Sequence, residues 1–323
     1  MIKLIFQKKI LIIEYLFILI ISFFYQNAYS GPLAYVPNEK TGSISIIDIK
    51  KDFVIESINV GDKPRGLAAS IDGEKLFISD QPNNVLVIVD LKKRIVSGKI
   101  GLGESPEGVS VSPDGMWVIA ASEKSNSVNF VNIKSNKKVF AVKTEGKNPE
   151  HAVFSPDGKY VFVSAEDSDS VDVIGVAERK QIKSIKVGMR PRGIAFTPDG
   201  KFSYVACELA DTVYAIDVEK LKVIASINAG KFSNGVTASP DGKRIYVSNG
   251  RDRTVSVITT NDNKIIKNIP VGKRPWNMAI SPDGLKLYVA NGRSDNISVI
   301  DTKKLKKVKD IPVGERPWGV LIK

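Results

Sequence analysis

The 323-residue chain contains few of the residues that crosslink folds or bind metals. It has a single cysteine, Cys207, so an intramolecular disulfide is excluded and the fold has to be held by packing and strand pairing. It also has a single histidine, His151, which excludes a multi-histidine metal site. With one cysteine, the sequence can hold neither a CxxCH haem attachment site nor a paired CxxC zinc motif. We therefore expect no metal site and no bound cofactor.

Several other features are missing as well. The chain has no GxSxG nucleophile motif, no glycine-rich phosphate loop before a helix, and, beyond residue 30, no window with the length and period of a helix. Its formal net charge of +12 is spread through turns and forms no basic stripe with interleaved aromatic residues. This pattern disfavours a nucleic-acid partner. It indicates a solvated outer rim or, alternatively, attraction to an acidic partner or an anionic envelope surface.

What the chain does have is a repeat. The tetrapeptide Ser-Pro-Asp-Gly starts at residues 112, 155, 239 and 281, and near copies start at residues 70 and 197. Successive starts lie 42, 43, 42, 42 and 42 residues apart. A fixed period of this length is typical of propellers and solenoids, and the content of each repeat decides between them.

Each repeat holds four short apolar segments separated by turn residues. In the best copy these are residues 277–280, 285–291, 297–301 and 308–313. Short runs of Val, Ile, Tyr and Ala indicate strands, and Ser-Pro-Asp-Gly is turn chemistry because proline presets φ and glycine takes positive φ. Four antiparallel strands in each repeat describe the blade of a β-propeller.

The strand count predicts an all-β, seven-bladed propeller. First strands are expected to begin near residues 66, 108, 151, 193, 235, 277 and 319. The first copies of the second, third and fourth strands precede the first turn motif, at residues 33–38, 43–49 and 53–60. The C-terminal strand, residues 319–322, should therefore join these three N-terminal strands and close the ring.

Residues 1–30 have the pattern of a secretory signal peptide. Lys3, Lys8 and Lys9 precede an apolar run, and small residues at positions 28 and 30 predict cleavage before Gly31. The alternative is an uncleaved anchor, in which case membrane contact would be limited to this segment. The remaining residues, 31–323, number 293, which is close to seven repeats of 42. We expect a single propeller domain in a periplasmic or otherwise exported protein.

The loops that lead into the first strands are predicted to surround the mouth of the central channel. In a four-stranded antiparallel blade, these leading loops lie on the same face as the loops between strands two and three. Glycine and proline recur in them as turn scaffolding, but the residue after the proline, or after Ser233, varies. In ring order this residue is Arg65, Glu107, Glu150, Arg192, Asn234, Trp276 and Trp318.

Two leading loops also depart from the glycine that usually follows, with His151 and Asn277 in its place. Together, these nine residues predict a ligand-binding channel mouth with a wall of two indoles and an arc of opposed charges, suited to a small organic ligand. Alternatively, Arg and Glu neutralise one another and the indoles pack on neighbouring loops. His151 could act as a general base or metal ligand, or as a hydrogen-bonding residue of the fold. Cys207 ends a second strand, as a small buried filler or, alternatively, a reactive thiol.

The repeats resemble the YVTN family of β-propeller repeats, as in LYVANGRSDNISVIDTKKLKKVKDIPVGERPWGV. Seven such repeats behind a signal peptide are most similar to exported propellers associated with pyrroloquinoline quinone (PQQ)-dependent alcohol catabolism. The resemblance implies a periplasmic accessory or binding role, with a dehydrogenase, a cytochrome or a transporter component as partner. It does not imply a quinoprotein, because such dehydrogenases have eight tryptophan-docked blades, whereas this chain has seven repeats and three tryptophans.

We therefore expect an exported propeller that binds a ligand or a protein and is not itself catalytic. One alternative is a propeller enzyme of lactonase or lyase type. Its candidate groups would be Glu107, Glu150, His151, Asn234 and Asn277. A second alternative is a structural or adhesive protein of the cell envelope.

Overall fold

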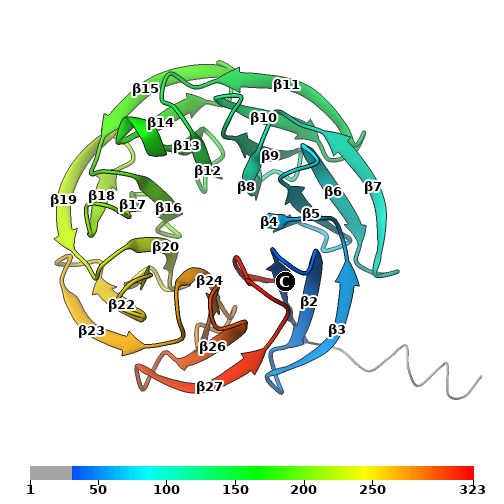
Figure 1. Ribbon diagram of the computed structural model, residues 1–323. Coiled ribbons are helices and arrows are strands. Elements are labelled where there is room, and N and C mark those ends of the chain that lie inside the picture. Colours follow the sequence, from blue (N-terminus) through cyan, green and yellow to red (C-terminus); the bar gives the residue numbers. More distant parts are fainter. Residues whose placement is uncertain (1–30) are drawn as a thin grey trace, which may run out of the picture.

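The computed structural model describes residues 31–323, so the predicted signal peptide lies outside the described residues. Seven four-stranded antiparallel sheets stand around a central channel as the blades of a propeller (Figure 1). We number them in ring order: blade 1 is β28-β1-β2-β3, blade 2 is β4 to β7, and so on to blade 7, which is β24 to β27. The predicted fold class and blade number are confirmed.

The four strand types recur in every blade. The inner strands are β28 (Leu321–Ile322), β4 (Pro64–Ala69), β8 (Pro106–Val111), β12 (Pro149–Phe154), β16 (Pro191–Phe196), β20 (Ser233–Ala238) and β24 (Pro275–Ile280). The second strands are β1 (Leu33–Asn38), β5 (Lys75–Asp80), β9 (Trp117–Ser122), β13 (Tyr160–Ala165), β17 (Phe202–Cys207), β21 (Arg244–Asn249) and β25 (Lys286–Asn291).

The outer half of each blade is equally regular. The third strands are β2 (Ser43–Asp48), β6 (Val85–Asp90), β10 (Ser127–Asn132), β14 (Ser170–Gly175), β18 (Thr212–Asp217), β22 (Thr254–Thr259) and β26 (Asn296–Asp301). The outermost are β3 (Phe53–Asn59), β7 (Ile95–Gly101), β11 (Lys137–Lys143), β15 (Lys180–Lys186), β19 (Lys222–Asn228), β23 (Ile265–Pro270) and β27 (Lys306–Pro312). The helical content of residues 31–323 is one 3₁₀ turn, η1 (Glu166–Ser168), and none of these residues belongs to a helix long and apolar enough to cross a membrane.

Most inner strands begin about two residues earlier than predicted, at the proline of the leading loop. In β24, Pro275 pairs with Asn291, and the register shifts by one residue before Met278 pairs with Val289. This is a β-bulge, a device that re-aims the side chains at the end of a strand. The residue after the proline, Trp276 in this blade, lies within the bulge at the channel mouth.

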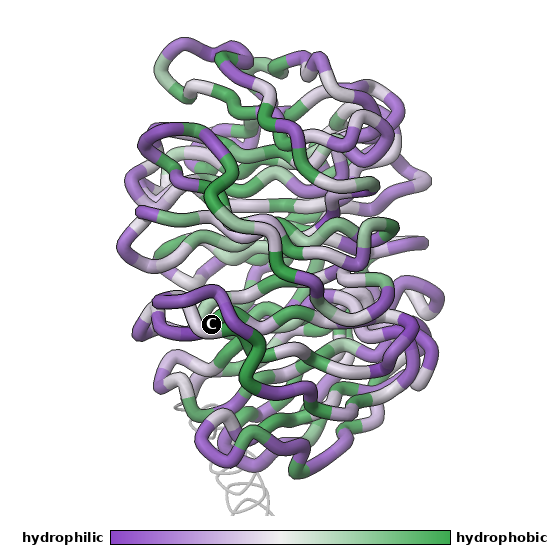
Figure 2. Tube along the Cα trace, turned by 90° about the vertical axis from the view of Figure 1, so that its left-hand side faces the viewer, coloured by the Kyte–Doolittle hydropathy of each residue, from purple (hydrophilic) through white to green (hydrophobic). Residues whose placement is uncertain are grey.

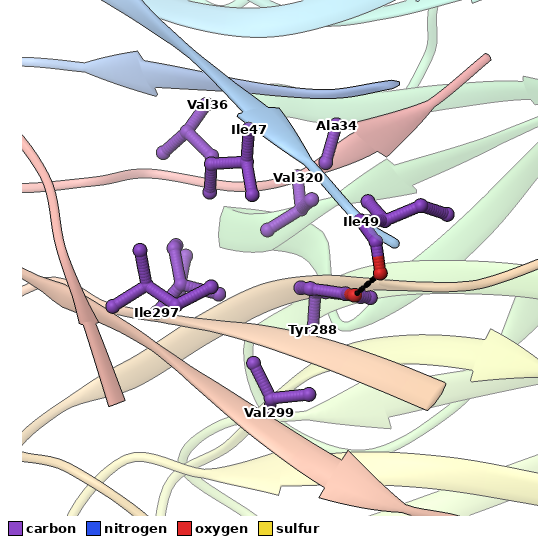
Figure 3. Close-up of a cluster of buried hydrophobic side chains, with 10 residues drawn as sticks. Ala34, Val36, Ile47, Ile49, Tyr288, Ile297, Val299 and Val320 are labelled. Atoms are coloured by element: carbon purple, nitrogen blue, oxygen red, sulfur yellow. Dashed lines mark hydrogen bonds between the residues drawn. The ribbon is translucent and has the colours of Figure 1, made fainter. Parts of the chain in front are cut away.

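The core consists of apolar layers between neighbouring blades. Between blades 7 and 1, Tyr288 and Val299 pack with Ala34 and Ile47 (Figure 3). The Tyr288 hydroxyl donates a hydrogen bond of 3.0 Å to the Ile49 carbonyl, so its polar atom is satisfied (Figure 3). Hydrophobic residues follow the strands, whereas hydrophilic residues gather in the loops on both faces (Figure 2). Because both faces of the second and third strands are buried, their sequences are mostly apolar, as in β6 and β9.

The two ends of the described chain close the ring. Ala34 pairs with Ile322 and Tyr35 with Leu321, and the Trp318 N–H donates to the Pro37 carbonyl at 2.9 Å. The strand β28 is two residues shorter than the predicted segment 319–322. The reason is that pairing with β1 is interrupted between an isolated bridge at Pro317 and Leu321.

The single cysteine belongs to this packed interior. Cys207 ends β17 and is fully buried as a free thiol. Burial raises the pKa of this thiol to about 12, so it is protonated at neutral pH. These properties agree with a small buried filler and disfavour a reactive thiol.

Candidate functional site

The leading loops are held to the ends of the second strands by hydrogen bonds. The Gly272 N–H donates to the Asn291 side-chain oxygen at 3.1 Å, and the Lys63 N–H donates to an Asp80 carboxylate oxygen at 3.0 Å. In six of the seven loops, the residue before the inner strand has a positive φ. These residues are Ser105, Asn148, Arg190, Phe232, Arg274 and Arg316. The left-handed conformation turns each loop toward the channel before the proline or serine begins the strand.

Six of the nine predicted site residues line one cavity of about 220 Å³ at the channel mouth. They are Arg65, Glu150, Arg192, Asn234, Trp276 and Trp318. The remaining three, Glu107, His151 and Asn277, lie nearby but do not line it: Glu107 is fully buried beside Arg65, and His151 and Asn277 contact Trp318. In six of the seven loops, the variable position after the proline or serine therefore faces one opening, and Glu107 is the exception.

The sequence analysis missed five lining residues, namely Glu39, Arg274, Gly292, Arg293 and Arg316. Two of them, Arg274 and Arg316, precede the proline. Glu39 and Gly292 directly follow the second strand. In ring order that position is Glu39, Gln81, Glu123, Glu166, Glu208, Gly250 and Gly292. Four blades have glutamate at this position, one has glutamine and two have glycine. This difference is visible in the repeat and identifies a second variable position at the channel mouth, which we call the second layer.

The glycines of this second layer leave room for large side chains. A Cβ at Gly292 would lie 2.4 Å from two ring atoms of Trp276. A Cβ at Gly250 would lie 2.9 Å from a terminal nitrogen of Arg274. Real Cβ atoms do not come as close as 2.4 Å. Blade 7 can therefore present Arg274 and Trp276 at the mouth because the second strands of blades 6 and 7 are followed by glycine.

The acidic half of the second layer holds the arginines. Arg192 contacts Glu150, Glu166 and Glu208, with its Nε 3.0 Å from the Glu208 carboxylate. Arg65 contacts Glu107 and lies 3.3 Å from Glu39. Arg274 also contacts Glu208, although the two residues are on blades 5 and 7. The predicted arc of opposed charges is thus a network of ion pairs that fixes the guanidinium groups.

Two carboxyl groups of this network titrate in opposite directions. Burial opposes ionisation of Glu150, but the Arg192 guanidinium and a hydrogen bond with Glu166 hold the pKa of Glu150 well below its usual range. Burial and the neighbouring Glu150 carboxylate raise the pKa of Glu166 far above its usual range. The shared environment therefore favours the ionised form of Glu150 and the protonated form of Glu166. Burial also raises the pKa of Glu107, against the opposing effect of Arg65.

The floor of the mouth is a ring stack across the channel. His151 of blade 4 and Trp318, which leads into blade 1, have ring centroids 5.4 Å apart and planes 12° apart. Blades 1 and 4 stand on opposite sides of the ring, so this stack spans the channel. Trp318 is 7% exposed. The channel is therefore crossed by side chains at this level.

The stacked histidine is neutral and enclosed. Burial lowers the pKa of His151 despite the neighbouring Glu150, and the imidazole shares a hydrogen bond with Asn277. Its Nδ1 is 3.9 Å from a Glu150 oxygen and has no hydrogen-bond partner among residues 31–323. The imidazole does not line the cavity, and this geometry supports a packing role more than that of a base or metal ligand. The described part of the chain contains no cluster of three or more His, Cys, Asp or Glu residues suited to a metal ion.

The lining as a whole is cationic and aromatic. Five arginines face the cavity against two glutamates, beside the Asn234 amide and two indoles. Guanidinium groups bind carboxylates and phosphates through paired hydrogen bonds, and indole faces bind planar rings. This arrangement can hold a small planar anion.

Comparisons with known proteins give a family and several similar folds. Residues 109–323 match the model of a family described as YNCE-like beta-propeller. Among the curated proteins, none matches. Kuenenia stuttgartiensis hydrazine synthase is 24% identical, with a TM-score of 0.72 over 79% of this chain and 88% of that chain.

Two further solved structures resemble the whole ring. A protein of unknown function from Desulfotomaculum acetoxidans has a TM-score of 0.80 at 17% identity, covering 90% of this chain and 98% of that one. A candidate 6-phosphogluconolactonase from Bacteroides fragilis has a TM-score of 0.78 at 18% identity, covering 92% of this chain and 99% of that one. At these identities the likenesses establish the fold and not the activity.

Proposed function

The chain belongs to the YNCE-like β-propeller family, and from this premise we propose that it is a binding protein whose channel mouth holds a small planar organic anion. One observation carries the proposal. The cavity of about 220 Å³ combines the Trp276 and Trp318 indoles with five arginine side chains. Pockets for drug-sized molecules usually measure about 300 to 1,000 Å³, so this mouth suits a ligand of about one ring with an acidic group.

Two of the arginines that line the mouth have no close carboxylate partner and can pair with an anionic ligand. Arg316 is 58% exposed, and its nearest carboxylate, Glu39, is 4.0 Å away. Arg293 is exposed and has no salt-bridge partner within residues 31–323. In contrast, Arg192 and Arg274 are already held by glutamates. The mouth therefore offers a fixed inner layer and a receptive outer layer of cations, and fixed groups lose little conformational entropy on binding.

The same contacts weigh against the enzymatic alternative. A lactonase or lyase would need a base or a metal-binding group that faces the cavity. Glu150 is held by Arg192, Glu107 is fully buried, and His151 is stacked on Trp318. The three ionisable candidates are thus occupied by contacts within the protein, which favours binding over acid–base chemistry.

We further propose that the protein is exported and works with a periplasmic dehydrogenase, cytochrome or transporter component. The support is the pattern of residues 1–30 and the resemblance to propellers of PQQ-dependent alcohol catabolism. PQQ is a planar aromatic tricarboxylate, so its charge and flat shape suit a cationic mouth with indole walls, where one of its three fused rings would enter the cavity. It is therefore one of the first compounds to test.

The test is thermal unfolding of the protein with benzoate, PQQ and an uncharged aromatic alcohol. A ligand at about one hundred times its dissociation constant should stabilise the fold by about 2.7 kcal/mol. We expect the aromatic acids to raise the midpoint and Trp276→Ala to abolish the rise. Lys134→Ala is the control for an unrelated surface substitution, because Lys134 is exposed in a turn on the opposite face. Equal midpoints for all three compounds, or a rise that survives Trp276→Ala, would refute the proposal.

A further inference from the structure

A second cavity adjoins the channel mouth on the same face of the ring. It measures about 380 Å³ and is lined by Arg251, Arg253, Lys273, Arg274 and Arg293 beside Phe232. No carboxylate of the described residues is part of its lining. Five cations therefore gather in one cleft between blades 6 and 7 without an anion among them, and we call it the basic cleft.

The acidic residues of the surrounding loops are used elsewhere. The Asp252 carboxylate accepts a hydrogen bond of 2.7 Å from the Lys231 N–H. The Asp211 carboxylate accepts one of 2.8 Å from the Phe232 N–H. Both acids accept backbone hydrogen bonds, and neither forms a salt bridge with a cleft cation within residues 31–323. Glu208 pairs with Arg274 from the channel side, so the repulsion among the other four cations is left for solvent or for a ligand to offset.

The cleft is nevertheless an organised structure. The Phe232 ring lies between two guanidinium groups, 4.1 Å from that of Arg251 and 5.3 Å from that of Arg274. These cation–π contacts orient both groups. Glu208 holds Arg274 from the channel side, and Gly250 provides the space in which Arg274 lies. Phe232 has a positive φ, which places its ring in this position at some conformational cost.

The cations of the cleft are also within reach of a dissolved ligand. Arg251, Arg253, Lys273 and Arg293 are exposed, and Arg274 is half-buried. Arg274 and Arg293 line both the basic cleft and the channel mouth. The two cavities are therefore neighbouring compartments of one cationic surface that share two arginines.

We propose that the basic cleft binds a doubly charged oxyanion, a phosphate monoester or a dicarboxylate, carried by the same ligand whose ring lies in the channel mouth. The assignment rests on the function proposed above for the mouth. Guanidinium groups match the oxygens of phosphate and carboxylate in pairs, and several such groups around one anion favour a double charge over a single one. The ligand class is thus a small aromatic or heterocyclic compound with a phosphate or a second acidic arm.

The experiment compares benzoate, phthalate, phenyl phosphate and inorganic phosphate by isothermal titration calorimetry at constant ionic strength. We expect phenyl phosphate or phthalate to bind at least tenfold more tightly than benzoate. Which of the two binds more tightly distinguishes a phosphate from a dicarboxylate. The double variant Arg251→Ala/Lys273→Ala should remove this advantage and leave benzoate binding unchanged. A second double variant, Arg251→Gln/Lys273→Gln, keeps a polar side chain and part of the aliphatic stem without the charge, and it should behave in the same way.

The outcomes separate the basic cleft from the mouth. If the double variants keep the advantage of the doubly charged compounds, or if the wild-type protein shows none, the basic cleft is refuted. If benzoate binding is lost in Trp276→Ala but the doubly charged compounds bind the wild-type protein no more tightly than benzoate, the mouth stands and the cleft fails. A third outcome is that inorganic phosphate binds to the wild-type protein and to Trp276→Ala but not to the double variants, while benzoate does not bind. In that case the cleft stands as an independent anion site, and the proposed function of the mouth fails. Lys134→Ala serves as the control for removal of a distant positive charge.

Discussion

Gly292→Ala should disturb the channel mouth without dismantling the ring. The added Cβ would lie 2.4 Å from Cε3 and Cζ3 of Trp276, whereas carbon atoms in contact are separated by about 3.5 to 4.0 Å. The indole therefore has to move by about 1 Å or more. Insertion of a methyl group into a packed site usually costs about 1 to 3 kcal/mol. Trp276 is only half-buried and can swing outward, so we expect a loss of about 1 kcal/mol in the free energy of unfolding.

The effect on binding should be larger than the effect on stability. The displaced indole would intrude on the cavity of about 220 Å³, so we expect benzoate affinity to fall at least tenfold, or about 1.4 kcal/mol. Urea denaturation and calorimetry measure the two effects on the same samples. Gly101→Ala is the control: its Cβ meets nothing within 4 Å, and it should be neutral or slightly stabilising. Wild-type stability combined with wild-type binding in Gly292→Ala would show that Trp276 does not occupy the space assigned to it.

Three further predictions follow from the fold. Deletion of residues 314–323 should expose the edge of β1 and lower the thermal midpoint sharply, with aggregation in light scattering; an unchanged midpoint would contradict the closure of the ring. Burial lowers the pKa of His151 below its unfolded-state value of about 6.5, so protonation of the imidazole destabilises the fold. The stability that the neutral imidazole contributes is present above about pH 6.5 and is lost as pH falls through the folded-state pKa. His151→Phe should flatten that acidic loss, and identical pH profiles for the two proteins would contradict the burial of a neutral imidazole. Cys207 should react with a chromogenic disulfide only after denaturation, because burial raises its pKa to about 12; rapid labelling of the native protein would be the contrary result.

Much of this molecule was predictable because its determinants are local. The Ser-Pro-Asp-Gly turns and the 42-residue period depend on neighbours in sequence, and they were sufficient to predict the strands, the number of blades and the pairing of the two chain ends. The phase of the repeat also placed the residue after the proline at the channel mouth, as Trp276 and Arg192 illustrate. Inner strand starts were misplaced by two residues, because the bulge that begins at the proline has no separate mark in the sequence.

The contacts between distant blades could not be predicted in the same way. The stack of His151 on Trp318 depends on the diameter of the closed ring, and Arg274 meets Glu208 because both reach over the same opening. The opposite titration of Glu150 and Glu166 arises from their burial around Arg192, which no spacing in the chain reveals. Local turn chemistry thus determined which residues stand at the channel mouth, whereas only the closed ring decided which of them neutralise one another and which arginines are left with charge for a ligand.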